Sequence, residues 1–259
     1  MCTIVILRRP DHEWPILIGA NRDEMKNRPW LPPARHWPDR PDVIAGIDQL
    51  GGGTWLGMNE DGVVAAVLNR FGTLGPADDK RSRGELPLEA LDHADAIDAA
   101  RSLADLDGRS WRPFNMVIAD NRDAYWLANR GKTKIEIHEI PEGLSILTAH
   151  DLNDRENSDR TRRNLPRFIS APVPNPEADD WFAWQALMAD TGVMPPDTEH
   201  HNMRRDAMLV RSDIGFETIS SSLIGLPGIP RHENELARRP IWLFANGQPD
   251  SAPYLPVAL

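Results

Sequence analysis

The chain begins with MCTIVILRRPDHEWPILIGANRDE (residues 1–24), in which two apolar runs flank a short polar turn. The runs 2–9 and 15–20 are rich in β-branched residues, which favour strands, and the turn between them contains proline and aspartate. We therefore predict an N-terminal β-hairpin. Residues whose numbers sum to about 24 then face each other, which places Cys2 opposite Arg22. The sequence leaves open which face carries Cys2, because a register slip of one residue would reverse every side chain.

A second hairpin is predicted further along the chain. The segment TWLGM (54–58) and the run VVAAVL (63–68) flank a turn with asparagine, aspartate and glycine, and the returning strand ends at Asn69. Between the two hairpins lies a proline-rich segment, residues 29–41. Because proline cannot stand inside a helix or a central strand, we predict an ordered loop there.

The rest of the chain contains strands in blocks and helices grouped between them. Ser82, followed three residues later by Glu85, is a capping-box pattern that predicts the start of a helical stretch. Apolar periodicity and turn signals predict strands at 114–119, 124–128, 134–140, 144–148, 217–224 and 241–245, and helices at 158–169 and 180–189. This grouping is typical of an antiparallel α+β fold. We expect residues 1–259 to form a single domain.

The composition limits the classes of function. Hydrophobic residues make up 41% and charged residues 26%, as in globular proteins. No run approaches the roughly 18 apolar residues that cross a bilayer and no signal-type segment opens the chain, so we expect a cytoplasmic protein without stable membrane insertion. A single cysteine excludes an intrachain disulfide and a four-cysteine zinc site, and we predict no metal. The net charge of −10 disfavours nucleic acid and favours a small-molecule ligand.

Cys2 directly follows the initiator methionine, whose removal would give this cysteine a free α-amino group. The α-amine has an ordinary pKa of about 7.7–8.0 and the thiol one of about 8.5, so proton exchange between them is favourable near neutral pH. One residue would then supply both the nucleophile and the base. The alternative is that Cys2 is a small buried strand residue, because free cysteines often only fill cores.

A series of short motifs runs from the N-terminus to about Asn115: MCT (1–3), ANRDE (20–24), RP (28–29), GGTWLG (52–57), LNR (68–70), RGEL (83–86) and PFN (113–115). Their order and spacing resemble the NRDE-motif family, also called the transport and Golgi organisation protein 2 family. That family is in turn similar to the N-terminal nucleophile hydrolases of the penicillin V acylase and bile salt hydrolase type. The resemblance implies a four-layer αββα sandwich of two antiparallel sheets.

The resemblance also implies roles for individual residues. Cys2 matches the nucleophile, Asp23 the aspartate near it, and Asn69 an asparagine that binds the oxyanion. The hydrolases place an arginine where this chain has Ala20, so the resemblance leaves Arg22 with a shifted position or a changed role. The alternatives without a role in catalysis are a structural ion pair for Arg22 and Asp23 and a turn-stabilising amide for Asn69.

Further residues are expected to contact the ligand. Arg160 resembles a later arginine of the hydrolases, and the segment that includes His150 stands where those enzymes have paired asparagines. Trp55 offers a large apolar surface with one donor, although core packing is its alternative role. The segment NRDE (21–24), which we call the acidic quartet, adds Asn21 to the set of expected ligand contacts.

Two functions follow from these observations. The first is an N-terminal cysteine hydrolase that acts on acyl amides or thioesters, acyl-coenzyme A among them, and requires no cofactor. The second is a non-catalytic protein that binds and traffics haem or a lipid or acyl ligand in the same cleft, since members of the resembling family have been tied to haem mobilisation and lipid metabolism. For haem, Cys2 or His150 would be an axial ligand.

Overall fold

The computed structural model describes residues 2–192, 204–230 and 238–259, which form two antiparallel sheets. The first sheet contains, in spatial order, β10 (Gly143–Leu147), β1 (Thr3–Arg8), β2 (Ile16–Met25), β11 (Phe216–Leu226), β12 (Ile241–Ala245) and β13 (Tyr254–Pro256). The second contains β3 (Trp30–Ala34), β4 (Val43–Asp48), β5 (Leu56–Asn59), β6 (Val64–Asn69), β7 (Phe114–Ala119), β8 (Ala124–Asn129) and β9 (Glu136–Glu139).

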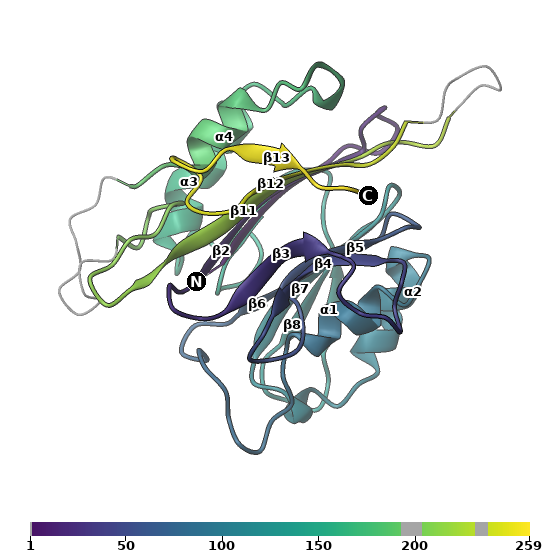
Figure 1. Ribbon diagram of the computed structural model, residues 1–259, viewed down its shortest axis with the longest axis vertical. Coiled ribbons are helices and arrows are strands. Elements are labelled where there is room, and N and C mark those ends of the chain that lie inside the picture. The colour runs from purple at the N-terminus through teal and green to yellow at the C-terminus, as the bar shows by residue number, and fades with distance from the viewer. Residues whose placement is uncertain (1, 193–203, 231–237) are drawn as a thin grey trace.

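Helices cover the outer faces of both sheets (Figure 1). The first sheet packs against α3 (Asp159–Ser170) and α4 (Phe182–Met188), and the second packs against α1 (Glu85–Ala90) and α2 (Ala96–Ala104). Short 3₁₀ turns, η1 (Gly108–Ser110) and η2 (Pro176–Ala178), lie between these elements. The predicted αββα sandwich is therefore confirmed.

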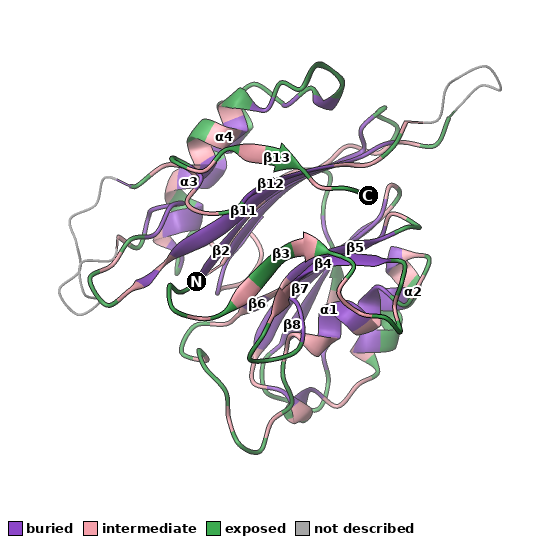
Figure 2. Cartoon of the chain, viewed as in Figure 1, coloured by how far each residue is buried: buried purple, intermediate pink, exposed green. Residues whose placement is uncertain are grey.

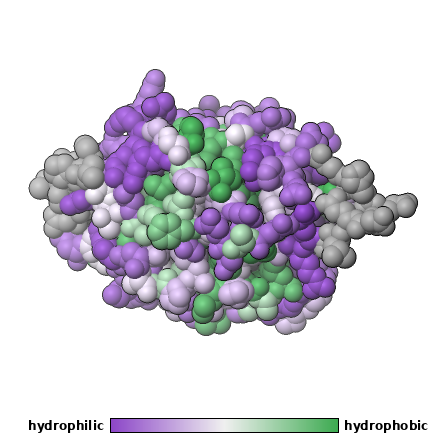
Figure 3. All heavy atoms as spheres, turned by 90° about the horizontal axis from the view of Figure 1, so that it is seen from above, coloured by the Kyte–Doolittle hydropathy of each residue, from purple (hydrophilic) through white to green (hydrophobic). Residues whose placement is uncertain are grey.

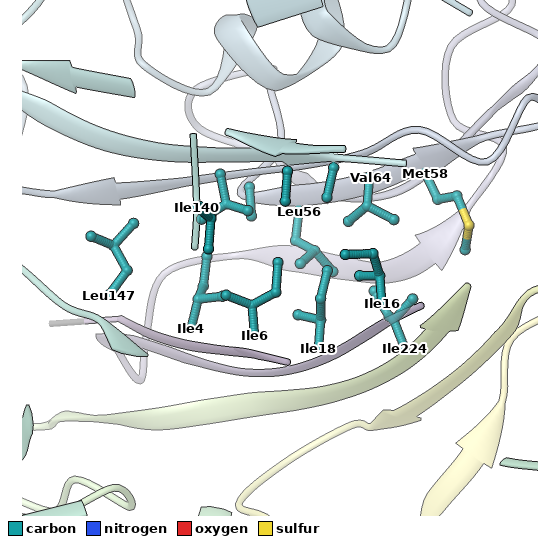
Figure 4. Close-up of a cluster of buried hydrophobic side chains, with 14 of the residues drawn as sticks. Ile4, Ile6, Ile16, Ile18, Leu56, Met58, Val64, Ile140, Leu147 and Ile224 are labelled. Atoms are coloured by element: carbon teal, nitrogen blue, oxygen red, sulfur yellow. The ribbon is translucent and has the colours of Figure 1, made fainter. Parts of the chain in front are cut away.

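The core between the sheets follows from strand periodicity. Ile4 and Ile6 of β1 and Ile18 of β2 point toward Leu56 and Val64 of the opposite sheet (Figure 4). The residues that alternate with them pack against α3 and α4 instead, because successive side chains of a strand point to opposite faces. Both faces of the central strands are thus buried, as Figure 2 shows.

The first hairpin has the predicted register. Thr3 pairs with Asn21 and Leu7 pairs with Leu17, so the residue numbers sum to 24. Strand β2 is longer than predicted and continues to Met25, because β11 pairs with its other edge. The acidic quartet therefore lies within a strand, where its side chains must alternate between two faces.

Two local predictions were wrong. The proline-rich segment contains a strand, β3, which tolerates Pro32 and Pro33 because it lies at the edge of its sheet and carries a register shift at that point. The helical stretch is divided into α1 and α2, and α1 begins after Gly84 without a side-chain cap. Ser82 accepts a hydrogen bond from the Gly84 amide and so stabilises the turn before the helix.

The surface is mixed in character. Seen from above, hydrophobic residues stand among hydrophilic ones (Figure 3). Phe182, Ile169 and Leu255 are among the exposed large hydrophobic residues. In the described ranges, no helix is both long and apolar enough to cross a bilayer.

Candidate active site

Cys2 lies just before β1, half-buried, where two hollows meet. One is a cleft of about 480 Å³ with both polar and apolar lining, and the other is a small, mainly apolar hollow of about 20 Å³ between the sheets. The Cys2 thiol donates a hydrogen bond to the main-chain oxygen of Asp23, with a sulfur–oxygen distance of 3.8 Å. The hairpin register therefore brings the sulfur beside the acidic quartet.

The quartet divides between the two faces of β2. Asn21 and Asp23 contact groups of the helical layer, whereas Arg22 contacts residues of the opposite sheet. The side chain of Asn21 donates hydrogen bonds to the carbonyl oxygens of Met188 and Met208 at 3.0 and 2.9 Å. The Asn21 amide thus links β2 to the helical layer that packs on this face.

Asp23 has a fully buried carboxylate that is held by two groups distant in the sequence. Arg160 Nη1 lies 3.2 Å from Asp23 Oδ2, and Thr218 Oγ1 donates a hydrogen bond of 2.6 Å to Oδ1. The same Arg160 nitrogen donates to Thr3 Oγ1, the hydroxyl of the residue that follows Cys2. These bonds place a fixed negative charge at the start of β1.

Arg22 is buried against aromatic rings on the other face. Its guanidinium carbon lies 3.7 Å from the centre of the Trp55 ring and 5.6 Å from that of Trp30, and Nη2 is 3.7 Å from Asp48 Oδ2. The second terminal nitrogen, Nη1, is buried without a hydrogen-bond partner in the described part of the chain. Burial lowers the pKa of Arg22. A buried donor without a partner is costly, and its position beside both hollows makes Nη1 a candidate for contact with a ligand.

Glycine residues make room for the packing of Arg22 on the Trp55 ring. Gly46 of β4 lies against the Trp55 ring so closely that an added Cβ would overlap it. Gly53 and Gly84 approach each other in the same way, and the Thr54 amide donates a 2.8 Å hydrogen bond to the Gly84 carbonyl. Two of the glycine-containing motifs are therefore explained by close backbone approach.

The thiol is held in its neutral form in the chain that retains Met1. Burial raises the pKa of Cys2, and the nearby charge of Asp23 raises it further. A protonated thiol is a weak nucleophile, so a separate base is needed for attack. Met1, whose removal would supply that base, lies outside the described residues.

The family follows from a comparison with known proteins. A sequence model of the family described as "Transport and Golgi organisation 2" matches residues 1–226. The chain belongs to this family. The homologues from Mus musculus and Homo sapiens are each 32% identical over 111 residues, which is 40% of this chain and 38% of either relative. The match thus spans well under half of the length of these Transport and Golgi organisation 2 homologues.

Solved structures confirm the fold of this family member. An N-acylethanolamine-hydrolyzing acid amidase ortholog from Caenorhabditis elegans matches with a TM-score of 0.58 at 14% identity, covering 89% of this chain and 94% of that one. Penicillin V acylase from Agrobacterium tumefaciens matches with a TM-score of 0.54 at 16% identity, covering 95% and 83%. At these identities the likeness shows a shared architecture.

The other residues expected to contact the ligand of this Transport and Golgi organisation 2 chain differ in whether they line the cleft. Asn69, at the end of β6, lines the large cleft with Cys2 and makes no side-chain hydrogen bond within the described chain. Trp55 lines both hollows. His150 lies outside the lining of both and stacks on Phe71 at 5.6 Å between ring centres.

Four residues in or beside the cleft were given no role from the sequence. Asp48 bridges Arg22 and Arg28, and Thr218 holds Asp23. Arg83 and Arg112 line the wide part of the cleft. The RGEL motif signalled Arg83, but no local pattern assigned it a role. Among the described residues, no group of three or more His, Cys, Asp or Glu side chains could hold a metal ion.

Proposed function

We propose that this chain is an N-terminal cysteine hydrolase that acts on acyl amides or thioesters. The observation that carries the proposal is the position of Cys2: its sulfur opens onto a cleft, while the buried Asp23 carboxylate stands beside the start of β1. The shared architecture with two structures described as an acid amidase and an acylase supports the same reaction class.

The residues suggest a sequence of steps. After removal of Met1, the α-amine of Cys2 takes the thiol proton while the sulfur attacks the acyl carbonyl. Asp23 holds the resulting ammonium. The negative charge on the former carbonyl oxygen is stabilised by Asn69 and by the unpartnered Nη1 of Arg22. The ammonium then protonates the leaving amine or thiolate, and water releases the acid from the acyl-cysteine.

The raised pKa of the thiol bears directly on this mechanism. With Met1 in place, the nitrogen of Cys2 is an amide and cannot accept a proton. Burial and Asp23 then keep the thiol neutral. Freeing the α-amine adds a positive charge next to the sulfur, which favours the thiolate. Processing of the N-terminus would therefore switch on the nucleophile.

The second function is binding of an acyl ligand without turnover. It is favoured by the neutral thiol of the unprocessed chain, which can line a cleft without reacting. For haem, Cys2 would have to lose its proton, because cysteine binds haem iron as a thiolate. His150 does not line the cleft, so haem binding there would depend on Cys2 without that histidine.

Mass spectrometry and single-turnover kinetics test the two functions together. We expect the native protein to lack Met1, and to gain the mass of an acetyl group on Cys2 when mixed with acetyl-coenzyme A or p-nitroacetanilide. Cys2→Ala should lose the adduct and at least about 10³-fold of the turnover. Cys2→Ser, which keeps the shape of the side chain, is the matched control for folding.

Other outcomes would contradict hydrolysis. Retained Met1 in active protein would exclude the free-amine mechanism. Equal turnover by wild type and Cys2→Ala would exclude Cys2 as the nucleophile. A Soret band on haem titration, lost in Cys2→Ala and unaccompanied by product from either acyl probe, would favour the binding function instead.

A further inference from the structure

The large cleft is rich in positive charge although the protein as a whole is acidic. Among the described residues, its lining contains six basic side chains and three acidic ones, in a chain of net charge −10. The basic residues are Arg22, Arg28, Lys80, Arg81, Arg83 and Arg112, and the acidic ones are Asp23, Glu24 and Asp48.

Four of the six cations face a carboxylate. Asp48 lies 3.7 Å from Arg22 and 2.8 Å from Arg28. Lys80 pairs with Asp79 at 2.9 Å, and Arg81 pairs with Glu85 at 2.8 Å. The charge of each of these side chains is therefore partly balanced within the protein.

Arg83 and Arg112 differ from the other four. In the described part of the chain neither has an acidic partner, and both donate to neutral oxygens. Arg83 Nη1 donates to the carbonyls of Thr73 and Pro113 at 2.9 and 3.1 Å, and Arg112 Nη1 donates to that of Leu74 at 2.7 Å. These bonds fix the positions of both guanidinium groups but place no carboxylate in direct contact with them, and the nearby charge of Glu24 offsets that of Arg83 only in part.

The two arginines also act on each other. Burial lowers the pKa of Arg83 to about 10, and the charge of Arg112 contributes to this shift. Arginine side chains are charged at neutral pH in proteins, so the fold holds two like charges beside one cleft. Arg112 donates only through Nη1 within the described chain, which leaves Nε and Nη2 for another acceptor.

We propose that Arg83 and Arg112 bind an anionic group, a carboxylate or a phosphate, on the leaving side of the acyl donor. Guanidinium groups bind both anions through paired, charge-assisted hydrogen bonds. The orientation rests on the proposed hydrolase function, because it assigns the arginine end of the cleft to the leaving group. Anion binding itself does not require turnover.

The smaller hollow limits the size of the acyl group that the site can accept. It adjoins Cys2 between the sheets, is lined by residues such as Leu56 and Leu68, and has a volume of about 20 Å³. A space of this size accepts a group about as large as one water molecule or methyl group. The substrate class is therefore a short acyl group, such as acetyl, joined to an anionic leaving group.

Matched thioesters test this assignment. The acetyl thioesters of N-acetylcysteamine, 3-mercaptopropionate and coenzyme A carry a neutral, a carboxylate and a phosphate-bearing leaving group. We expect wild type to prefer the anionic donors, and Arg112→Gln to lower kcat/KM about tenfold for them through KM, with less than a twofold change for the neutral donor. The preferred anionic donor distinguishes a carboxylate from a phosphate site.

Two further variants control for charge and folding. Arg109→Gln removes the same charge from an exposed arginine that pairs with Asp107 and does not line the cleft, and it should change neither class of donor. Arg83→Lys keeps the charge of the more buried arginine and should keep part of the preference, with the thermal midpoint reporting its folding. An anionic-to-neutral ratio that is the same in wild type, Arg112→Gln and Arg83→Lys would overturn the proposal.

Calorimetry on Cys2→Ala separates this proposal from the proposed hydrolysis. Coenzyme A or the acetyl thioester of 3-mercaptopropionate should bind this variant, and additional Arg112→Gln should weaken binding about tenfold. Such binding without wild-type turnover would overturn the hydrolase and retain the anion site. Turnover with no preference for anionic donors would retain the hydrolase and overturn the anion site. Faster turnover of octanoyl than acetyl donors on one anionic thiol would overturn the short-acyl assignment.

Discussion

The two faces of β2 differ in how closely their charged side chains are paired. On the face toward α3 and α4, Asp23 is held by Arg160 and Thr218, and the Asn21 amide nitrogen bonds two carbonyls. On the face toward the second sheet, Arg22 has a carboxylate only at 3.7 Å. Each face also has one buried atom without a hydrogen-bond partner among the described residues, Asn21 Oδ1 on the first and Arg22 Nη1 on the second. We call the face of Asp23 the paired face, because its charged group is the more closely held of the two.

The largest expected effect concerns the paired face. Asp23→Asn keeps the size of the side chain but removes its charge, leaving the buried Arg160 without this counter-charge. Breaking a buried pair in this way typically costs roughly 3–5 kcal/mol. Chemical denaturation should therefore show a clear loss of unfolding free energy in Asp23→Asn. A midpoint equal to wild type would contradict the view that this face stabilises the strand.

Arg22→Gln tests the opposite face. Because burial disfavours the Arg22 charge and Asp48 is not in close contact, we expect its loss to leave the thermal midpoint unchanged or to raise it. If Nη1 stabilises the oxyanion, kcat should fall about 100-fold, as for other single oxyanion donors. Paired kinetic and thermal measurements on one preparation check this. A large loss of stability with normal kcat would mean that Arg22 is structural.

Two glycine substitutions compare how tightly the two faces of β2 are packed. An added Cβ at Gly46 meets the rigid Trp55 ring beneath Arg22, whereas one at Gly19 meets the flexible end of Met188 at 3.3 Å on the paired face. Gly46→Ala should destabilise by about 2 kcal/mol through overpacking, and Gly19→Ala by less. Tryptophan fluorescence with denaturant reports both. Equal costs would show that Trp55 moves as easily as Met188.

The smallest expected effect is a dependence of stability on pH behind the paired face. Burial on its own would raise the pKa of Asp190, but hydrogen bonds from Arg163 and Arg167 outweigh it and hold the pKa at about 2. Because this lies below the unfolded value of about 3.9, the ionised form stabilises the fold above that value and the benefit is lost as pH falls from about 4 to about 2.

Asp190→Asn should remove this dependence. We expect the variant to be about 1 kcal/mol less stable than wild type at pH 6, which is less than the full shift implies because solvent screens this partly exposed group, with the gap closing between pH 4 and pH 2. Denaturation curves at several pH values measure the difference. A gap that stays constant across this range would contradict the assignment.

Much of the first hairpin was predictable because its contacts are local. Two β-branched runs and a turn of known length predict antiparallel pairing, and the observed Thr3–Asn21 pair has the expected register. Prediction was weaker where distant segments intervene. The extension of β2 to Met25 depends on β11, which follows nearly two hundred residues later, and β3 is a strand because β4 lies beside it.

By itself, the sequence predicted the N-terminal hairpin, the meeting of Cys2 with the acidic quartet, and the family. The tertiary structure decided which face each quartet residue occupies, because the alternation of β2 acquires a meaning only when helices cover one side and a second sheet covers the other. It also joined Arg160 to Asp23 across 137 positions and, in the part of the chain that the structure describes, left Arg83 and Arg112 without a carboxylate in direct contact. Charge pairing between distant segments depends on how the layers pack, and no local pattern of residues encodes it.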